Sequence, residues 1–535
     1  MRPAKDRTAS EQDAVAGHAD LMARTAAGLR WSTLATIGLA SSTLVYTALI
    51  SRLIDPFAFG LLAMANLVVL FTNFFARMGL AEAIIQKPDL SREEIGAAST
   101  VGIAAGVGCF AIVWVAAPAL GGLFSEPALP PVLRVMSSSF LFVGVSMTGQ
   151  GLLRRQLRFR ELAIIRLGTY VLGFLVVGIG LALLGAGVWS LVAAVVASAA
   201  AQAVWQYARL RHPVLPPVTL EPYRVLFGYG VRSSGIRLLE YVGSNLDTLT
   251  VARVAATALV GQYNRAFYLV TQPLTQHLAG TLTLVFFPSI SRVQGDVPRL
   301  RRAYLSVLGL GGVILFPICA GMAVAAQELV RVVLGPQWDV AAGIVPWIAL
   351  AGGFNVISKF SSLLTEARAE LNKALLLQGS YLVVLAALLI AALRFRPGTS
   401  VWVFGAALAV GEIFRHLAYL GVVRRLVQAS AADLWLAHAP AVFCSAGVAL
   451  AIALARAATI DQLPAIAVLA IEIAVAACAL ALCIRFCPVP ELRRQSWSRL
   501  SSANAVGQPG GLRWRLISLI LGPVQATPTL PVVKE

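Results

Sequence analysis

The chain has 535 residues, of which 58% are hydrophobic and 13% are charged, and its mean hydropathy is +0.79. A soluble globular domain carries about 25% charged residues, so the composition excludes a soluble protein and indicates one that lipid solvates. The net charge of +18 would suggest nucleic acid in a soluble domain. In a membrane protein it is typical of basic loops that meet anionic headgroups, so we expect membrane lipids and no nucleic acid as partners.

Residues 1–27 are polar, and we expect them to form a cytoplasmic N-terminal segment. The apolar run after Arg30 has no small-residue cleavage site, so it is predicted to be a retained span and not a signal peptide. Apolar windows long enough to cross a bilayer recur from there, and only helices satisfy their backbone groups in lipid. The sequence predicts an all-α polytopic membrane protein of about 14 transmembrane helices, near residues 31–51, 59–78, 97–117, 133–150, 162–184, 188–206, 226–248, 259–287, 304–325, 341–364, 374–392, 401–422, 435–455 and 463–484.

Lysine and arginine are divided unevenly between alternate connections of these helices. The two ends of the chain and every second connection carry most of them, including Arg154, Arg155 and Arg299. Because excess Lys and Arg marks the cytoplasmic side, the bias predicts an even number of spans and two cytoplasmic termini. Arg237 and Arg265 fit neither side, since both lie inside apolar segments.

A proline-rich stretch divides the chain. Residues 207–225 are predicted to be a cytoplasmic linker between an N-terminal six-helix lobe, 28–206, and a C-terminal six-helix lobe, 226–422. Residues 423–487 then hold transmembrane helices 13 and 14, and residues 488–535 form a polar, basic cytoplasmic tail.

The two lobes repeat parts of each other's sequence. Arg52–Gly60 matches Arg253–Gly261, and Val188-Trp189 matches Val401-Trp402. Repeats with an even number of helices are parallel and are related by an axis along the membrane normal. We therefore expect two six-helix repeats with any substrate site between them.

Polar residues inside the predicted spans are the candidates for function, because such groups are costly in a bilayer. The seventh span carries Arg237, Glu240 and Asp247 on one helical face. The sequence therefore predicts a charged helix face at membrane depth.

The eighth span carries Arg265, Gln272 and Gln276 and is interrupted by Pro273, whose missing N–H frees a carbonyl one turn earlier. Irregular backbone at membrane depth occurs where it lines a cavity. The second span is the repeat counterpart of the eighth, and it has polar residues at the same spacing: Asn66, Asn73 and Arg77.

Structural roles compete with functional ones at these positions. Arg237 and Glu240 form either an i,i+3 pair that fixes helix packing or part of a polar cavity. Arg265 and Asp247 need partners from other helices, from water or from each other. The asparagines and glutamines can form hydrogen bonds between helices as well as bind a substrate. Arg77 and Asp247 can also lie at the ends of spans, with their charged groups reaching the membrane surface.

Enzyme signatures are missing from the sequence. It contains no aspartate pair spaced for a metal-bound sugar nucleotide, no Walker loop, no HExxH and no GxSxG. We therefore expect no enzyme, no catalytic residue, no metal site and no cofactor.

Eight short stretches carry a family resemblance. Ser51–Gly60 and Met78–Gln86 resemble the polysaccharide-transporter family of the multidrug/oligosaccharidyl-lipid/polysaccharide exporter superfamily, the Wzx-type flippases. Further matches follow in order at Leu152–Phe159, Gly187–Val192, Asn245–Asp247, Gly261–Ala266, Phe287–Arg292 and Gly335–Trp338, so the resemblance covers residues 28–425.

The resemblance implies a two-lobed, V-shaped bundle in the bacterial cytoplasmic (inner) membrane. It implies alternating access that moves a polyprenyl-pyrophosphate-linked oligosaccharide from the cytoplasmic to the periplasmic leaflet, for exopolysaccharide, capsule or O-antigen synthesis. It also implies coupling to H⁺ or Na⁺ in some members, and we expect the polysaccharide polymerase machinery as a further partner.

In such a protein we expect Arg237 or Arg265 to attract the pyrophosphate, and Glu240 or Asp247 to bind a proton or sodium ion. Water and sugar hydroxyls would meet the amides, which are Asn66, Asn73, Gln272 and Gln276. The first alternative is a drug or cation antiporter of the same superfamily, for which a carboxylate-dominated cavity is expected. The second is an integral-membrane glycosyltransferase or polysaccharide polymerase.

Overall fold

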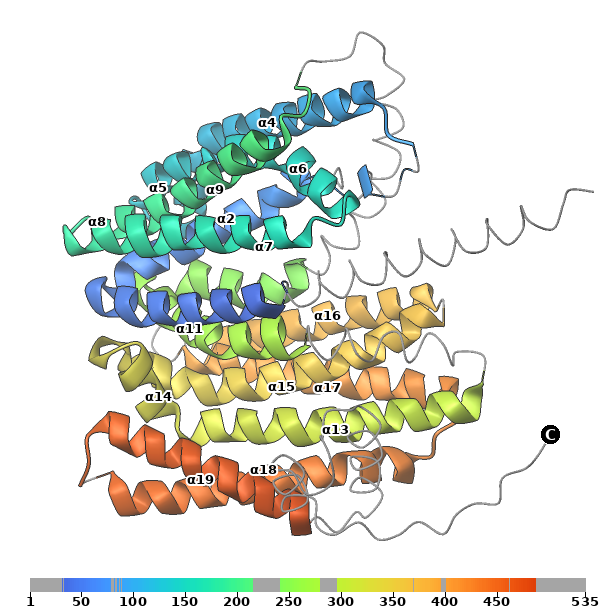
Figure 1. Ribbon diagram of the computed structural model, residues 1–535. Helices are drawn as coiled ribbons and strands as arrows, with labels where there is room; N and C mark the ends of the chain where they lie inside the picture. The colour runs from blue at the N-terminus through green and yellow to red at the C-terminus, as the bar shows by residue number, and fades with distance from the viewer. Residues whose placement is uncertain are drawn as a thin grey trace, which may run out of the picture. The chain divides into compact units, whose positions relative to one another are not determined.

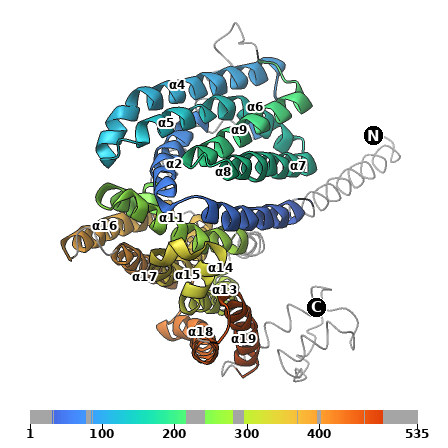
Figure 2. The same ribbon diagram turned by 90° about the vertical axis from the view of Figure 1, so that its left-hand side faces the viewer.

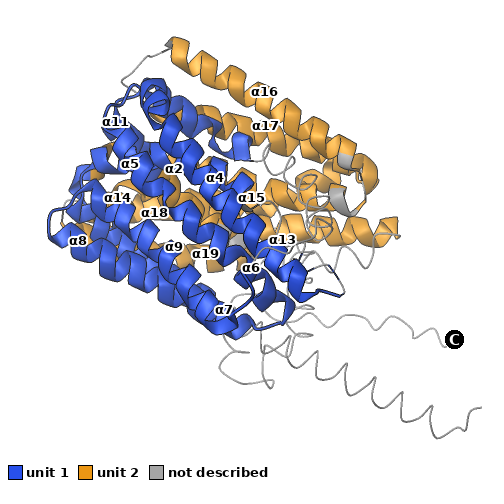
Figure 3. Ribbon diagram, turned by 90° about the horizontal axis from the view of Figure 1, so that it is seen from above, with its two compact units in different colours: residues 1–265, 333–337 blue, residues 266–332, 338–535 orange. Residues whose placement is uncertain are grey.

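The computed structural model of the protein describes residues 31–214, 241–279, 296–395 and 401–486, apart from residues 32, 78–80, 82–83, 86, 88, 369 and 461. These ranges are built of helices and contain no strand (Figure 1). Contacts divide the chain into two compact units (Figure 3). Unit 1 comprises the chain up to Arg265 and Val333–Gln337, and unit 2 comprises Ala266–Val332 and the chain from Trp338 onwards.

Unit 1 begins with a helix over Thr33–Leu53. A further unlabelled helix covers 241–254. The other helices are α2 (Pro56–Arg77), α4 (Arg92–Phe124), α5 (Leu129–Ser137), α6 (Ser139–Arg155), α7 (Phe159–Tyr170), the π-helix η1 (Val171–Gly178), α8 (Ile179–Leu183), α9 (Val188–Leu210) and the first part of α11 (Thr257–Thr271).

Unit 2 contains the end of α11 and the helices that follow it in the chain. They are the π-helix η2 (Gln272–Ala279), α13 (Val297–Val324), α14 (Ala326–Val333), α15 (Asp339–Ala367), α16 (Leu371–Phe395), α17 (Trp402–Leu426), α18 (Ala431–Thr459) and α19 (Ala465–Phe486). A short 3₁₀ turn, η3 (Pro336–Trp338), precedes α15; its first two residues and the last residue of α14 belong to unit 1.

Twelve helices in the described ranges are long and apolar enough to cross a membrane, so the predicted all-α, multi-pass membrane fold is confirmed. The seventh and eighth predicted spans, 226–248 and 259–287, lie partly outside the described residues, so the total of 14 stays a prediction. The same holds for the lobe boundaries, for most of the linker 207–225 and for the V shape. The terminal segments 1–27 and 488–535 lie wholly outside the described residues.

Several helices extend beyond the apolar windows that predicted them. The window 97–117 belongs to α4, which begins at Arg92 because Ser91 and Glu94 form a capping box. The Ser91 hydroxyl accepts from the Glu94 N–H at 3.1 Å, and the Glu94 carboxylate accepts from the Ser91 N–H at 3.0 Å. Hydropathy marks only the part of a helix that lies in hydrocarbon, whereas caps determine where the helix begins.

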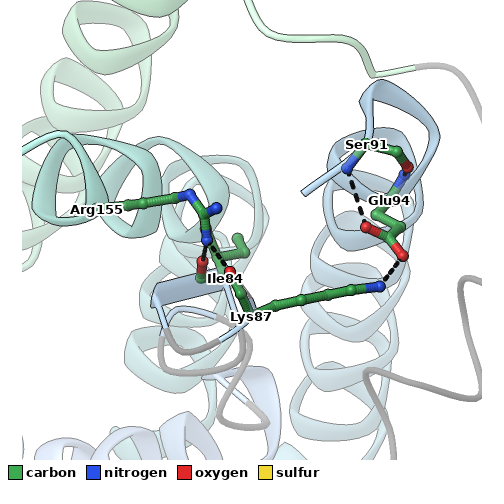
Figure 4. Close-up of polar contacts among 5 residues, drawn as sticks. All are labelled: Ile84, Lys87, Ser91, Glu94 and Arg155. Atoms are coloured by element: carbon green, nitrogen blue, oxygen red, sulfur yellow. Dashed lines mark hydrogen bonds and ion pairs between the residues drawn. The ribbon is translucent and has the colours of Figure 1, made fainter. Parts of the chain in front are cut away.

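The connection from α2 to α4 is bonded to the end of α6 (Figure 4). The Arg155 guanidinium donates to the carbonyl of Ile84 at 2.9 Å and to the carbonyl of Lys87. Lys87 in turn pairs with Glu94 of α4. Arg155, which contributes to the predicted cytoplasmic charge, therefore also holds three segments of unit 1 together.

Two glycines that the repeat analysis aligned with each other meet in unit 1. A Cβ on Gly60 would lie 1.8 Å from the carbonyl oxygen of Thr257, and one on Gly261 would lie 1.9 Å from that of Pro56. Pro56 and Thr257 occupy equivalent positions in the two repeats. The contact between α2 and α11 is therefore reciprocal, as expected for repeats related by a two-fold axis.

Candidate functional site

Asp247 is fully buried in unit 1. The Tyr263 hydroxyl of α11 donates to its Oδ2 at 2.6 Å, and both side chains are 0% exposed. The helix that carries Asp247 packs on α2, since the Tyr241 hydroxyl donates to the carbonyl of Leu67 at 2.5 Å and its ring lies 5.2 Å from that of Phe74. The Asp247 carboxylate is therefore part of the interior of unit 1 and does not snorkel.

Arg265 lies two residues beyond Tyr263 on α11 and is 9% exposed. Its guanidinium carbon is 3.9 Å from the centre of the Phe59 ring on α2, a cation–π contact. Tyr46 and Tyr170 lie within electrostatic range of the same guanidinium. A permanent positive charge inside an apolar segment is thus surrounded by aromatic residues from three parts of unit 1.

The two tyrosines near Arg265 belong to an aromatic cluster. Tyr170 stacks on Phe174 with ring centres 4.6 Å apart, and Tyr46 meets Phe174 edge-on at 5.1 Å. Phe174 lies in the π-helix η1, which begins directly after Tyr170 and widens the helix there. Such π-segments inside α-helices are frequent at functional sites, and ring faces are surfaces on which the apolar faces of sugars stack.

The irregular backbone predicted at Pro273 is confirmed. The π-helix η2 begins at Gln272, one residue before this proline. Gln272 is half-buried and belongs to unit 2, whereas Arg265 belongs to unit 1. Gln276 lies in the same π-helix, but its side chain is outside the described part.

The remaining predicted residues are distributed as follows. Asn66 and Asn73 are half-buried on α2, and the Oδ1 atom of Asn73 has no hydrogen-bond partner among the described residues. Arg77 is the last residue of α2, and its side chain is not described. Arg237 and Glu240 lie outside the described residues. The structure therefore places Asn66, Asn73, Asp247 and Arg265 in unit 1, on α2 and on the two helices that contact it.

The structure also contains a buried ionic network in unit 2 that the sequence analysis did not single out. Glu412 of α17, 3% exposed, accepts from the Asn355 amide of α15 and from the Tyr381 hydroxyl of α16, each at 3.0 Å. Its second oxygen pairs with Arg415 at 2.5 Å. The signal was available, because Glu412 and Arg415 have i,i+3 spacing inside the predicted span 401–422.

Two histidines that are scattered in the sequence meet beside this network. The Nε2 atoms of His416 on α17 and His438 on α18 are 3.1 Å apart, and His438 Nδ1 donates to the Leu434 carbonyl at 2.7 Å. Only the fold brings them together, since 22 residues separate them in the chain. The pair links α17 to α18.

The fold and these buried groups define a multi-pass membrane protein with charges at membrane depth, where transport proteins keep their functional residues. The chain belongs to the family described as polysaccharide biosynthesis protein, whose model matches residues 49–343. The resemblance to the Wzx-type polysaccharide transporters is thereby confirmed.

Two curated relatives and one solved structure illustrate this membership. The chain is 23% identical over 356 residues to the lipopolysaccharide biosynthesis protein WzxC of Escherichia coli (strain K12), covering 66% of this chain and 72% of that protein. It is 25% identical over 326 residues to the succinoglycan biosynthesis transport protein ExoT of Rhizobium meliloti (strain 1021), covering 60% and 65%. The fold is similar to that of the lipid II flippase MurJ in an inward closed conformation, with a TM-score of 0.67, 12% identity and coverage of 85% of this chain and 97% of that one.

Proposed function

We propose that the protein is a flippase that moves a polyprenyl-pyrophosphate-linked oligosaccharide from the cytoplasmic to the periplasmic leaflet of the bacterial inner membrane. The glycan is a repeat unit for exopolysaccharide, capsule or O-antigen synthesis. Support comes from the family, from relatives named for lipopolysaccharide biosynthesis and succinoglycan transport, and from a fold shared with a flippase. The uneven loop charges favour two cytoplasmic termini.

The observation that carries the proposal is the position of Arg265. The substrate's pyrophosphate must cross an apolar layer, and a buried guanidinium supplies positive charge inside that layer. The rings around Arg265 suit the apolar faces of sugars, and the half-buried amides of Asn66 and Asn73 suit their hydroxyls. None of these steps makes or breaks a covalent bond, so the proposed activity is transport without catalysis.

Asp247 is the carboxylate we assign to ion coupling. Its carboxylate is buried and accepts a hydrogen bond from the Tyr263 hydroxyl, and carboxylates inside membrane spans are the groups on which transporters bind protons or ions. Alternating access then requires α2 and α11 to change their angle, and the side-chain-free crossing at Gly60 and Gly261 suits such movement. Export in the presence and absence of Na⁺ distinguishes the two ions.

Charge reversal at Arg265 tests the proposal. In a strain that lacks the wild-type gene, Arg265→Glu is expected to abolish polysaccharide export and to leave complete lipid-linked repeat units on the cytoplasmic leaflet. Arg253→Glu is the matched control, because Arg253 is an exposed arginine on the preceding helix. Accumulation of incomplete glycans would indicate an enzyme, and altered drug sensitivity with normal export would indicate a drug antiporter; either result contradicts the proposal.

A further inference from the structure

Three helices of unit 2 bring two buried carboxylates and an arginine together, away from the residues considered so far. Glu328 lies on α14, Arg456 on α18 and Glu472 on α19, and α18 and α19 lie side by side (Figures 1 and 2). Glu328 is 4% exposed and Glu472 is 1% exposed. The surrounding cluster is apolar and includes Ile452 of α18 and Leu469 of α19.

Arg456 directs its hydrogen bonds to α14 and to the last residue of α13. Its Nε is 3.2 Å from a Glu328 oxygen, and its terminal nitrogens donate to the Gln327 side chain at 2.7 Å and to the Val324 carbonyl at 3.1 Å. The positive charge of Arg456 is thus matched by the negative charge of Glu328.

Glu472 has no such match. Neither of its carboxylate oxygens has a hydrogen-bond partner among the described residues, although Glu328 and Arg456 are both within electrostatic range. If Glu472 were ionised, the three groups would carry a net charge of −1 in an apolar setting; if it is protonated, they are neutral. A bare buried carboxylate is costly, and a second carboxylate nearby raises that cost.

We propose that Glu328, Arg456 and Glu472 form a proton-binding site in which Glu472 takes up the proton. Sodium is a poorer occupant, because a hard cation needs several oxygen ligands and Arg456 already places a positive charge in the cluster. Among the described helices, α13 also packs on α19 and meets it with apolar residues such as Phe316. In the described part, the charged groups that act on Glu472 are therefore Glu328 and Arg456.

The site lies near one end of the helix pair. Glu472 is in the eighth position of α19, which begins at Ala465, so it is roughly 10 Å along the axis from that end. Arg456 is three residues before Thr459, where α18 ends. Protons therefore exchange with the aqueous phase next to the α18–α19 connection, and loss of the proton weakens the packing of α19 on α18. This inference does not depend on the substrate proposed above.

Dicyclohexylcarbodiimide tests the site in the purified full-length protein, because it labels carboxylic acids that are protonated in apolar surroundings. We expect an adduct at Glu472, located by peptide mass spectrometry, that declines as the pH is raised and is the same in sodium and choline chloride. The adduct should be lost in Glu472→Gln. It should decrease in Glu328→Gln, since Arg456 is then released to pair with Glu472 and ionise it.

Two results with the wild-type protein would overturn the proposal. One is a complete absence of labelling at Glu472 across the whole pH range. The other is protection of Glu472 by sodium, which would identify a sodium site. Glu472→Gln should remain folded, because glutamine closely matches the shape of a protonated glutamate. Polysaccharide export is not used as a readout, so failure here is distinguishable from failure of the flippase proposal.

Discussion

The two units hold their buried charges in different ways. In unit 2, Glu412 accepts two hydrogen bonds and pairs with Arg415 one turn along the same helix. In unit 1, Arg265 lies against the face of Phe59, and Asp247 accepts the phenol of Tyr263. A charge paired within its own helix chiefly fixes packing, whereas contacts between α2 and α11, which cross at two bare glycines, change when these helices move against each other. We therefore expect the unit 2 network to govern stability and the unit 1 site to govern transport.

The largest effect is expected from breaking the unit 2 pair. Glu412→Ala leaves Arg415, whose side chain is only 13% exposed, without its carboxylate, and losing one partner of a buried ion pair costs about 3–5 kcal/mol. The thermal unfolding midpoint in detergent should fall strongly, and export should fall only as far as the amount of folded protein does.

The double variant Glu412→Leu/Arg415→Leu is the control for this prediction. It removes both charges and keeps apolar volume, so it should be much more stable than Glu412→Ala. A Glu412→Ala protein that melts normally but does not export would show that the unit 2 network is functional, and the contrast between the units would be wrong.

A smaller effect is expected from the phenols that each unit buries. Tyr263→Phe removes a hydrogen bond to a carboxylate, worth about 1.5–3 kcal/mol, whereas Tyr304→Phe removes the bond between the Tyr304 and Ser361 hydroxyls, worth about 0.5–1.5 kcal/mol. Both tyrosines are 0% exposed, so burial is matched. Chemical unfolding should show a larger loss of stability for Tyr263→Phe than for Tyr304→Phe.

The same two variants test the coupling role of Asp247. If only Tyr263→Phe also alters the ion dependence of export, that role is supported; an unchanged ion dependence argues against it.

A smaller effect than that of the phenols is expected from the Phe59 ring beneath Arg265. Phe59→Leu removes a cation–π contact worth about 0.5–2 kcal/mol and is expected to lower export by weakening the position of the guanidinium. Phe360→Leu in unit 2 is the packing control, since Phe360 is equally buried. If both variants reduce export to the same extent relative to folded protein, Phe59 acts through packing alone.

The sequence was sufficient wherever the signal is local or repeated. Apolar windows located the spans, Pro273 predicted the irregular backbone that η2 shows, and the repeat analysis aligned Gly60 with Gly261, which the structure brings into contact. Asp247 and Arg265 were identified from the sequence because an ionisable residue inside a membrane span has a high free-energy cost and is therefore rare.

What the sequence could not supply is the set of partners. Asn355 and Tyr381 are 57 and 31 residues from Glu412, and only the packing of three helices brings them together. Glu412 and Arg265 both lie inside predicted spans, so the sequence alone could not show that one accepts hydrogen bonds from two other helices and the other lies against a phenylalanine ring. That distinction depends on tertiary contacts.

The smallest effect concerns histidines inside the two units, whose contacts again differ. His416 and His438 bond to each other in unit 2, whereas His212 in unit 1 lies beyond the end of α9, beside Tyr207 and 3.2 Å from the Ser99 hydroxyl. Burial lowers the pKa of His212 from its ordinary value of 6.5, and the hydrogen bond to the Pro213 carbonyl partly opposes this.

The native state therefore binds a proton at His212 less readily than the unfolded chain does. The contribution of His212 to the free energy of unfolding is therefore present above pH 6.5 and is lost as the pH falls towards the lowered pKa of the native state. The unfolding midpoint should fall between pH 7.5 and 5.5 by slightly more in the wild type than in His212→Gln, and an identical fall in both would show that His212 does not contribute.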